Sequence, residues 1–355
     1  MPRWPMILGS ALVLVLLPAW RIFYASIVMS ALGSERILFL GASSLVKEIS
    51  EYIAENPEFG LSALGYLDDC LNPSPALAIP RIGCISDLSK AVQELKPDRI
   101  VVGMAERRGR LPVNDLLDLR FAGIRIEDAL TTYETTFGRV CVRELRPSQL
   151  IFSAELGPQP SRVFWQSIYS FVIALFATIL ALPIMLLVAA VVRVSSAGPV
   201  FYRQVRVGRD GEPFTLYKFR SMYVNAEAKT GAVWAIKDDP RVTPAGRWLR
   251  KLRLDELPQL LNVVRGEMSI VGPRPERPEF VETLTEKIPY YRQRHCVKPG
   301  ITGWAQINLK YGDSLEDTIK KLEYDLFYIK NLAASLDAYI IFHTMKVMLL
   351  SRGAQ

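Results

Sequence analysis

This chain contains few histidines, and its four cysteines form no recognisable motif. Two histidines occur among 355 residues, too few to supply the ligands of a usual zinc site. The cysteines form no Cys-x-x-Cys pair and lie far apart, at Cys70, Cys84, Cys141 and Cys296. We therefore predict that all of them are reduced, buried thiols in a protein that faces the cytosol.

Several motifs that define rival functions are missing. Gly41 stands alone where a dinucleotide-binding fingerprint has three glycines, which favours a regulatory or scaffolding sheet domain. None of the fourteen tyrosines is followed four positions later by lysine, so the Tyr-x-x-x-Lys pair of sugar-nucleotide dehydratases and reductases is excluded. No nucleic-acid motif is present, and the net charge of +7 therefore indicates lipid headgroups and phosphate as partners, not nucleic acid.

Residues 35–148 alternate between short apolar runs and helical patterns. The first run, Arg36 to Leu40, turns into a helix at Gly41. This alternation predicts an α/β domain with a parallel, Rossmann-like sheet. The expected strands lie at 36–41, 64–67, 99–103 and 124–126, and the expected helices at 45–55, 85–95 and 113–121.

Residues 1–34 predict an N-terminal membrane helix or anchor. No charge occurs from Trp4 to Trp20, and Tyr24 adds a third aromatic residue of the kind found at membrane interfaces. A secretory signal peptide fits less well, because no small-x-small cleavage site follows cleanly.

Val163 to Val192 is a second charge-free run, and it contains Pro183. A straight span needs only about 20 residues, and proline breaks or bends a helix. Arginines flank both ends of the run, so the positive-inside rule does not favour a crossing. We predict a re-entrant membrane helix over residues 163–193 that turns at Pro183, with a proline-kinked span as the alternative.

Asp255 and Glu256 are adjacent carboxylates in a strongly cationic stretch. A basic run precedes them, and Pro273-Arg274-Pro275 follows. One carboxylate could hold Mg²⁺ while the other attacks or takes a proton, and arginines could neutralise phosphate oxygens. The alternative is a helix start, where acidic residues complement the dipole.

Residues 194–355 predict a mainly α-helical, membrane-associated domain with a β-hairpin. Alternating strands flank a turn at 208–211, and Lys218 and Arg220 share one strand face at the hairpin's end. We predict that both bind substrate phosphate. The expected helices lie at 245–253, 257–265, 278–287, 315–330 and 336–350, and the last could rest on the membrane surface.

Several motifs occur together in the order that a known family shows. They are Pro183, Lys218-Phe-Arg-Ser-Met, Leu254-Asp-Glu-Leu-Pro-Gln-Leu, Val271-Gly-Pro-Arg-Pro-Glu and Lys298-Pro-Gly-Ile-Thr-Gly-Trp-Ala-Gln-Ile-Asn. Over about residues 163–352 the chain resembles the bacterial sugar transferases that move a sugar 1-phosphate from a nucleotide sugar to polyprenyl phosphate. It looks similar to the large exopolysaccharide-type members, which carry a Rossmann-like domain ahead of the catalytic part.

The resemblance implies roles for individual residues. Asp255 would be the nucleophile, and Glu256 would hold Mg²⁺. Arg274 would bind phosphate, with Arg250 as the basic residue before the dyad and Lys218 as the family's motif lysine. Asp325, in Tyr324-Asp-Leu-Phe-Tyr, resembles a further functional acid.

The same resemblance implies an enzyme of the bacterial inner membrane with its catalytic domain on the cytoplasmic face. Its partners would be a nucleotide sugar, expected to be a UDP-sugar, and undecaprenyl phosphate. Two departures stand out: there is room for one early membrane helix where large members have about four, and Leu182 precedes Pro183 where many relatives have serine. A non-catalytic membrane scaffold is the alternative function, and the sugar and any homo-oligomer stay open.

Overall fold

The computed structural model describes most of the chain after residue 33. The described residues are 34–70, 77–104, 110–145, 157–224, 226, 239–309 and 314–349, together with 9, 12, 13, 15–20 and 23. Most of the predicted N-terminal membrane segment therefore lies outside the described residues, although residues 15–20 are helical. The chain forms two compact units that divide between Phe137 and Gly138.

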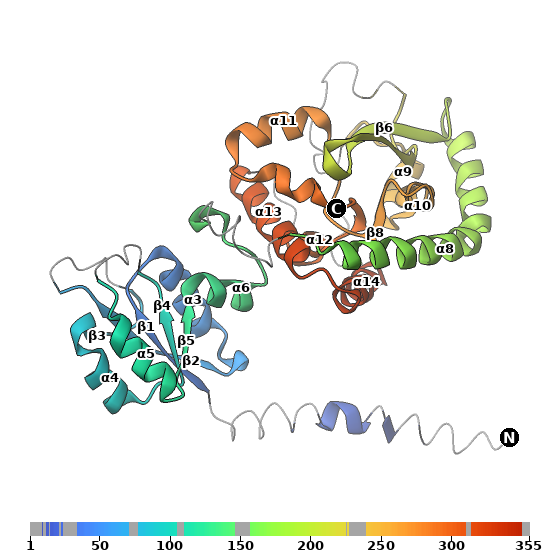
Figure 1. The fold of residues 1–355 in the computed structure, drawn as a ribbon. Coiled ribbons are helices and arrows are strands. Elements are labelled where there is room, and N and C mark those ends of the chain that lie inside the picture. The colour runs from blue at the N-terminus through green and yellow to red at the C-terminus, as the bar shows by residue number, and fades with distance from the viewer. Residues whose placement is uncertain are drawn as a thin grey trace. The chain divides into compact units, whose positions relative to one another are not determined.

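The first unit contains a five-stranded parallel sheet with the order β3-β2-β1-β4-β5 (Figure 1). This order, with helices between the strands, is typical of a doubly wound sheet and confirms the predicted Rossmann-like domain. The strands are β1 (Glu35–Leu40), β2 (Leu61–Asp68), β3 (Arg81–Cys84), β4 (Arg99–Val102) and β5 (Arg125–Asp128). The helices are α3 (Ser44–Glu55), α4 (Leu88–Leu95), α5 (Val113–Phe121) and α6 (Ala129–Phe137).

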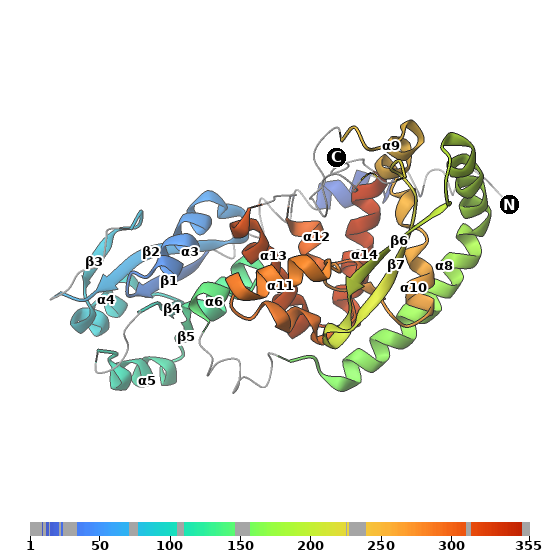
Figure 2. The ribbon, with the colours of Figure 1, turned by 90° about the horizontal axis from the view of Figure 1, so that it is seen from above.

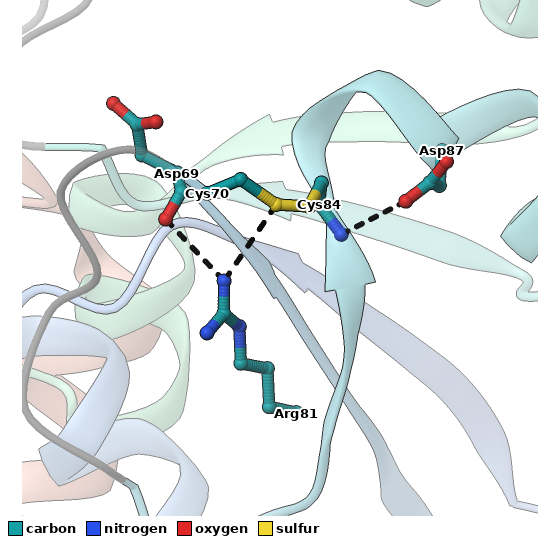
Figure 3. The surroundings of a disulfide bond; sticks show 5 residues. All are labelled: Asp69, Cys70, Arg81, Cys84 and Asp87. Atoms are coloured by element: carbon teal, nitrogen blue, oxygen red, sulfur yellow. Dashed lines mark hydrogen bonds between the residues drawn. A yellow bond between two sulfur atoms is a disulfide. The ribbon is translucent and has the colours of Figure 1, made fainter.

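The cysteine prediction is wrong for one pair. Cys70 and Cys84 form a disulfide, with their Cα atoms 5.4 Å apart (Figure 3). Cys70 follows β2 closely and Cys84 ends β3, and these adjacent parallel strands bring the two residues together despite their separation of 14 positions. The edge strand β3 was not expected, because its four residues lack an apolar run. Cys141 and Cys296 are free thiols, and Cys141 is buried as predicted.

The second unit is mainly helical and contains the predicted hairpin. Strands β6 (Phe201–Val207) and β7 (Pro213–Phe219) pair antiparallel and lie side by side in Figure 2. Two short parallel strands that the sequence did not reveal, β8 (Ser269–Val271) and β9 (Gly300–Thr302), flank the Pro-Arg-Pro turn. The helices are α8 (Pro160–Ser195), α9 (Pro244–Lys251), α10 (Gln259–Val264), α11 (Pro278–Lys287), α12 (Trp304–Asn308), α13 (Leu315–Lys330) and α14 (Ala334–Leu349).

Helix α8 is continuous over 36 residues and includes Pro183. Within the described part of the chain, it is the one helix long and apolar enough to cross a membrane. Figure 1 shows α8 running along one side of the second unit and then changing direction, so that it has two arms. Proline is the usual cause of such a bend, because it lacks the backbone donor and clashes with the preceding turn.

Both arms of α8 pack against the same folded unit. Val163 of the first arm joins a core with α13 and α14, whereas Val188 and Val192 of the second arm pack with Phe219 and Leu249. The opposite face of the helix leaves large apolar side chains exposed, including Phe176, Leu180 and Leu187.

Polar contacts tie each arm to a strand. Asp337 of α14 is 1% exposed and accepts hydrogen bonds from Gln166, Tyr169 and Tyr328. Gln166 and Tyr328 also donate to the carbonyl of Val271, the last residue of β8. At the other end, the Arg220 guanidinium that follows β7 donates to the carbonyls of Val192, Ser196 and Ala197.

Candidate active site

The acidic dyad lies in a short 3₁₀ turn, Leu254–Glu256, just after α9. Arg253 before the turn adopts a left-handed conformation with φ of 55°, which redirects the chain sharply out of the helix. Asp255 is 8% exposed. Burial raises the pKa of the Asp255 carboxyl and Glu256 acts in the same direction, although Lys218, Arg250 and Arg274 oppose the shift.

Glu256 is surrounded by cations from three segments. Its Oε1 accepts from Lys218 Nζ at 2.9 Å and from Arg274 Nη2 at 2.9 Å, and Arg253 lies 4.0 Å from its Oε2. Burial alone would raise the pKa of Glu256, but the charges and hydrogen bonds of Lys218 and Arg274 hold it well below its usual range. The structure thus brings together four residues predicted from the sequence: Asp255, Glu256, Lys218 and Arg274.

Two arginine side chains fix the Pro273-Arg274-Pro275 turn by hydrogen bonds to its backbone carbonyls. Arg294 Nη2 donates to the carbonyl of Arg274 at 3.0 Å, and Arg206 Nη1 donates to that of Pro275 at 3.0 Å. Gly272 and Gly300 let the flanking strands approach so closely that a Cβ on either residue would meet backbone atoms. The turn therefore presents Arg274 from a rigid support.

Arg294 forms a fully buried ion pair with Asp325. Its Nε and Nη2 donate to Asp325 Oδ2 at 3.0 and 2.7 Å, and both side chains are 2% exposed. Burial opposes the charge of Arg294, but Tyr291 and Asp325 raise its pKa above the usual value. The contacts of Asp325 are therefore with Arg294, which links it to the Arg274 turn and not directly to the dyad.

Two predicted phosphate-binding residues make other contacts. Arg250 Nε donates to Ser221 Oγ at 3.0 Å, close to the end of β7. Arg220 is 6% exposed and directs its terminal nitrogens to the carbonyls that end α8. These contacts favour a supporting role for Arg220, and its binding of substrate phosphate stays a prediction.

Sequence reasoning missed Arg294, together with a second, half-buried charge cluster near it. Glu276 pairs with Arg206 and Lys321. Arg294, which follows Tyr-Arg-Gln, lies in no recognised motif, whereas Glu276 ends the Val271-Gly-Pro-Arg-Pro-Glu motif, in which the resemblance assigned a role to Arg274 alone. For Glu276 the sequence signal was its position directly after the Pro-Arg-Pro turn, and Arg294 had no such signal.

Two further side chains near the site are Trp304 and His295, and the contacts of Trp304 are those of a packing residue. Trp304 Nε1 donates to the Gly138 carbonyl at 2.7 Å, and its ring stacks on Phe327 with centroids 5.9 Å apart. His295 lines a small cavity beside Arg274 and Arg294. Burial lowers the pKa of His295 to about 4, so its imidazole is neutral at pH 7.

The described residues contain no cluster of three or more histidine, cysteine, aspartate or glutamate side chains that could form a metal cage. Mg²⁺ does not require one, because it commonly binds through one or two carboxylates, substrate phosphates and water. Glu256 Oε2 has Arg253 at 4.0 Å, and both Glu256 oxygens are within a cationic setting that also suits phosphate. Both close cations bond Oε1, so Oε2 is the Glu256 oxygen that would take a metal arriving with a phosphate substrate, and this binding stays a prediction.

Comparison with known proteins gives consistent matches. A sequence model described as bacterial sugar transferase matches residues 161–351. A UDP-glucose:undecaprenyl-phosphate glucose-1-phosphate transferase of Klebsiella pneumoniae is 36% identical over 318 residues, which cover 88% of this chain and 67% of the relative. The protein of the same name from Xanthomonas campestris pv. campestris is 34% identical over 325 residues, covering 86% of this chain and 65% of the relative.

A third relative matches a shorter region. It is a UDP-N-acetylgalactosamine-undecaprenyl-phosphate N-acetylgalactosaminephosphotransferase of Aeromonas hydrophila, 43% identical over 222 residues that cover 62% of this chain and 52% of the relative. The chain thus spans between about half and two thirds of the length of these curated relatives.

Proposed function

The chain belongs to the bacterial sugar transferase family, and from this premise we propose that it transfers a sugar 1-phosphate from a UDP-sugar to undecaprenyl phosphate. This would be the initiating step of exopolysaccharide or related glycan synthesis. The observation that carries the proposal is the dyad itself: a buried Asp255 beside a Glu256 that Lys218 and Arg274 keep ionised.

In the proposed first step, a carboxylate oxygen of Asp255 attacks the phosphorus that bears the sugar. An acyl-phosphate bond to the sugar phosphate forms, the phosphoanhydride bond breaks, and UMP leaves with the bonding electrons. In the second step, a phosphate oxygen of undecaprenyl phosphate attacks the same phosphorus. The acyl-phosphate bond then breaks, which regenerates Asp255 and yields the lipid-linked diphosphate sugar.

The neighbouring cations counter the repulsion between these anionic reactants. Lys218 and Arg274 lie on either side of Glu256, within reach of phosphate oxygens at the dyad. Glu256 would hold Mg²⁺, which supplies Lewis-acid stabilisation of the diphosphate when bound. Because Lys218 and Arg274 now contact Glu256, we expect them to turn towards substrate phosphate when the metal and nucleotide sugar bind.

We propose that α8 enters and leaves one leaflet of the bacterial inner membrane, with the second unit on the cytoplasmic face. Gln166 of the first arm and Val192 of the second arm both contact residues of the same folded unit. A helix tied to one unit at both ends is easier to accommodate by a turn at Pro183 than by a crossing. The site would then lie at the headgroup plane, where the phosphate of the lipid substrate is found.

The test is a panel of UDP-sugars incubated with purified protein, Mg²⁺ and undecaprenyl phosphate, with UMP release as the readout. One sugar should support release, and Asp255→Asn should lower the rate by at least about 1,000-fold, on the scale of a lost nucleophile, while the fold persists. Glu256→Gln should raise the Mg²⁺ requirement. Near-normal UMP release by a folded Asp255→Asn protein would refute the nucleophile assignment, and no release with any sugar would favour the scaffold.

A further inference from the structure

A buried carboxylate on α14 is the centre of a hydrogen-bond network at the first arm of α8. Asp337 is 1% exposed and lies in the first turn of its helix. Its Oδ2 accepts from Gln166 Nε2 at 2.9 Å and from the Tyr169 hydroxyl, and its Oδ1 accepts from the Tyr328 hydroxyl at 2.8 Å. All of these donors are neutral, and Asp337 forms no ion pair with the residues that the structure describes. A carboxylate is expensive to bury without a counter-charge, so we looked for what this one holds in place.

Two of the three donors also reach strand β8, which lies beside α8 and α14 (Figure 1). Gln166 Nε2 lies 3.3 Å from the carbonyl oxygen of Val271, and the Tyr328 hydroxyl lies 3.2 Å from the same oxygen. Both side chains are buried. Val271 is the last residue of β8, and Arg274 follows it by three positions. The network therefore ends on the carbonyl from which the Arg274 turn begins.

The charge of Asp337 determines which atoms its neighbours present. A carboxylate only accepts hydrogen bonds, so Gln166 has to direct its NH₂ group, and not its carbonyl, towards Asp337. The same NH₂ group then faces the Val271 carbonyl. Asp337→Asn would introduce an amide that can also donate, which allows the Gln166 amide to flip. Its oxygen would then oppose the Val271 carbonyl oxygen, and the hydrogen bond to β8 would be lost.

The path from Val271 to Arg274 is short, and its backbone has little room to adjust. The Gly272 amide donates to the Thr302 carbonyl at 2.9 Å, which joins the end of β8 to β9. A Cβ on Gly272 would lie 2.5 Å from a backbone oxygen, so the strands already approach as closely as they can. A shift of the Val271 carbonyl would therefore displace Arg274, whose Nη2 lies 2.9 Å from Glu256.

From these contacts we propose that Asp337 is a positioning residue for the transfer reaction and that it acts through Arg274. It orients the donors Gln166 and Tyr328 against the Val271 carbonyl and so fixes where the turn presents its guanidinium. The proposal rests on the proposed function of the dyad. Because Gln166 belongs to the first arm of α8, the same network ties the long apolar helix to the turn that carries the phosphate-binding arginine.

The experiment is a double-mutant cycle on the full chain, read as UMP release with enzyme in excess so that slow rates can be timed. Asp337→Asn should lower kcat/KM for the UDP-sugar that the parent uses by about 10- to 100-fold, the scale of a slightly misplaced binding group. In an Arg274→Ala background the same substitution should cost less than about 2-fold, because the group that it displaces is absent. An equal fold-loss in both backgrounds would overturn the proposal, since a carboxylate that only stabilises the fold would act in either.

Two tyrosines on the same carboxylate provide a matched pair of variants. Tyr328→Phe removes a donor to both Asp337 and Val271, so it should reproduce the kinetic loss and serves as the test if Asp337→Asn does not fold. Tyr169→Phe removes a donor to Asp337 alone and should leave kcat/KM close to the parent value. Equal kinetic losses in the two tyrosine variants would overturn the proposal, because the link to β8 would then have no part in the effect.

Hydrogen exchange gives a readout that needs no turnover. The Gly272 amide should exchange about 10-fold faster in folded Asp337→Asn or Tyr328→Phe protein than in the parent, and at the parent rate in Tyr169→Phe. Parent-like exchange in all three variants of an active protein would overturn the proposal and leave the proposed function intact. No UMP release by the parent with any UDP-sugar would refute the proposed function and, with it, the catalytic role of Asp337.

Discussion

Asp255 and Glu256 are neighbours in sequence whose surroundings separate them chemically. Glu256 touches two cations at 2.9 Å, whereas Asp255 is buried and makes no such contact with the residues that the structure describes. Their pKa values shift in opposite directions, which is the usual sign that two carboxylates have different tasks. This difference supports the proposed roles, in which Asp255, the less stabilised anion, is the nucleophile and Glu256, the better stabilised one, would hold the metal.

Arg294 and Asp325 give the first residue-scale prediction. Asp325→Asn leaves a buried guanidinium without its counter-charge, which should lower the free energy of unfolding by about 3 kcal/mol or more. Because Arg294 also holds the Arg274 carbonyl, the KM for the nucleotide sugar should rise in the protein that remains folded. Thermal unfolding in detergent and UMP-release kinetics would measure the two effects.

A nearby cation provides the control for that pair. Arg292 is exposed on the same 3₁₀ segment, so Arg292→Ala should change the free energy of unfolding by less than about 0.5 kcal/mol. Equal effects of Arg292→Ala and Asp325→Asn would show that the ion pair has no special role.

Glu276 leads to a prediction about pH. Burial would raise its pKa, but Lys321 and Arg294 oppose this and the pKa is lowered to about 2. A carboxyl whose pKa is lower in the folded state than in the unfolded state stabilises the fold at pH values above its unfolded-state pKa, here 4.5. That stability is lost as the pH falls towards the folded-state pKa of about 2. The parent should therefore lose stability steeply between pH 4.5 and 2, while Glu276→Gln, weaker at pH 7, should show a flatter loss. Identical slopes in acid titrations of the two proteins would contradict the assignment.

The residues that the sequence predicted are those within recognisable motifs. Asp255, Glu256, Lys218 and Arg274 occur in motifs of five to seven residues, and the structure brings them together at the dyad. Arg294 escaped notice because its importance comes from a partner 31 positions away. The disulfide was missed for the same reason, since its two cysteines meet only after β2 and β3 pair. Long-range pairing of this kind leaves no local pattern.

At the scale of elements, periodic apolar segments were predicted and short irregular ones were not. Helices α3, α11 and α13 lie within a residue or so of their expected ranges, since each has a clear apolar stripe or capping residue. Strands β8 and β9 have three residues each, too few to show an alternating pattern. These two strands nevertheless position the Arg274 turn. The sequence therefore predicted the Pro-Arg-Pro motif but not the strands that support it.

Helix α8 gives a prediction about topology. If it is re-entrant, Ser161 and Ala197, exposed near its two ends, lie on the same side of the membrane. Single cysteines at these positions, in a background without native cysteines, should both resist an impermeant thiol reagent in intact cells. Both should react once the membrane is opened. Labelling of only one in intact cells would show a true crossing.

Pro183 can be tested in the same assay. Pro183→Ala restores a backbone donor and removes the ring clash, which should straighten the helix and favour a crossing. Transferase activity should fall with the change in labelling pattern. Leu182→Ala, which alters an exposed side chain beside the proline but not the backbone, is the matched control and should leave both labelling and activity unchanged.

At the scale of the whole molecule, the boundary between the two units predicts which truncations retain activity. The division after Phe137 leaves residues 138–145 with the second unit. Gly138 accepts a hydrogen bond from Trp304, and the Val142 amide donates to Glu323 Oε1 at 3.2 Å. Arg139 lies 3.6 Å from the same carboxylate, which is 1% exposed.

Deleting residues 1–137 should therefore leave a folded protein with measurable UMP release in lipid discs, because every residue of the proposed site lies in the second unit.

Deleting residues 1–150 should be harmful, since it removes Arg139 and the Val142 amide and leaves Glu323 buried without them. The expected cost is about 3 kcal/mol or more in the free energy of unfolding. If the lost partners of Glu323 are the cause, Glu323→Gln should recover part of that stability in the shorter fragment, because a neutral amide costs less to bury than a carboxylate that has lost two of its partners. Equal stability and activity of the two fragments would show that residues 138–150 are dispensable, and inactivity of a folded 138–355 fragment would show that the sheet domain contributes to the reaction.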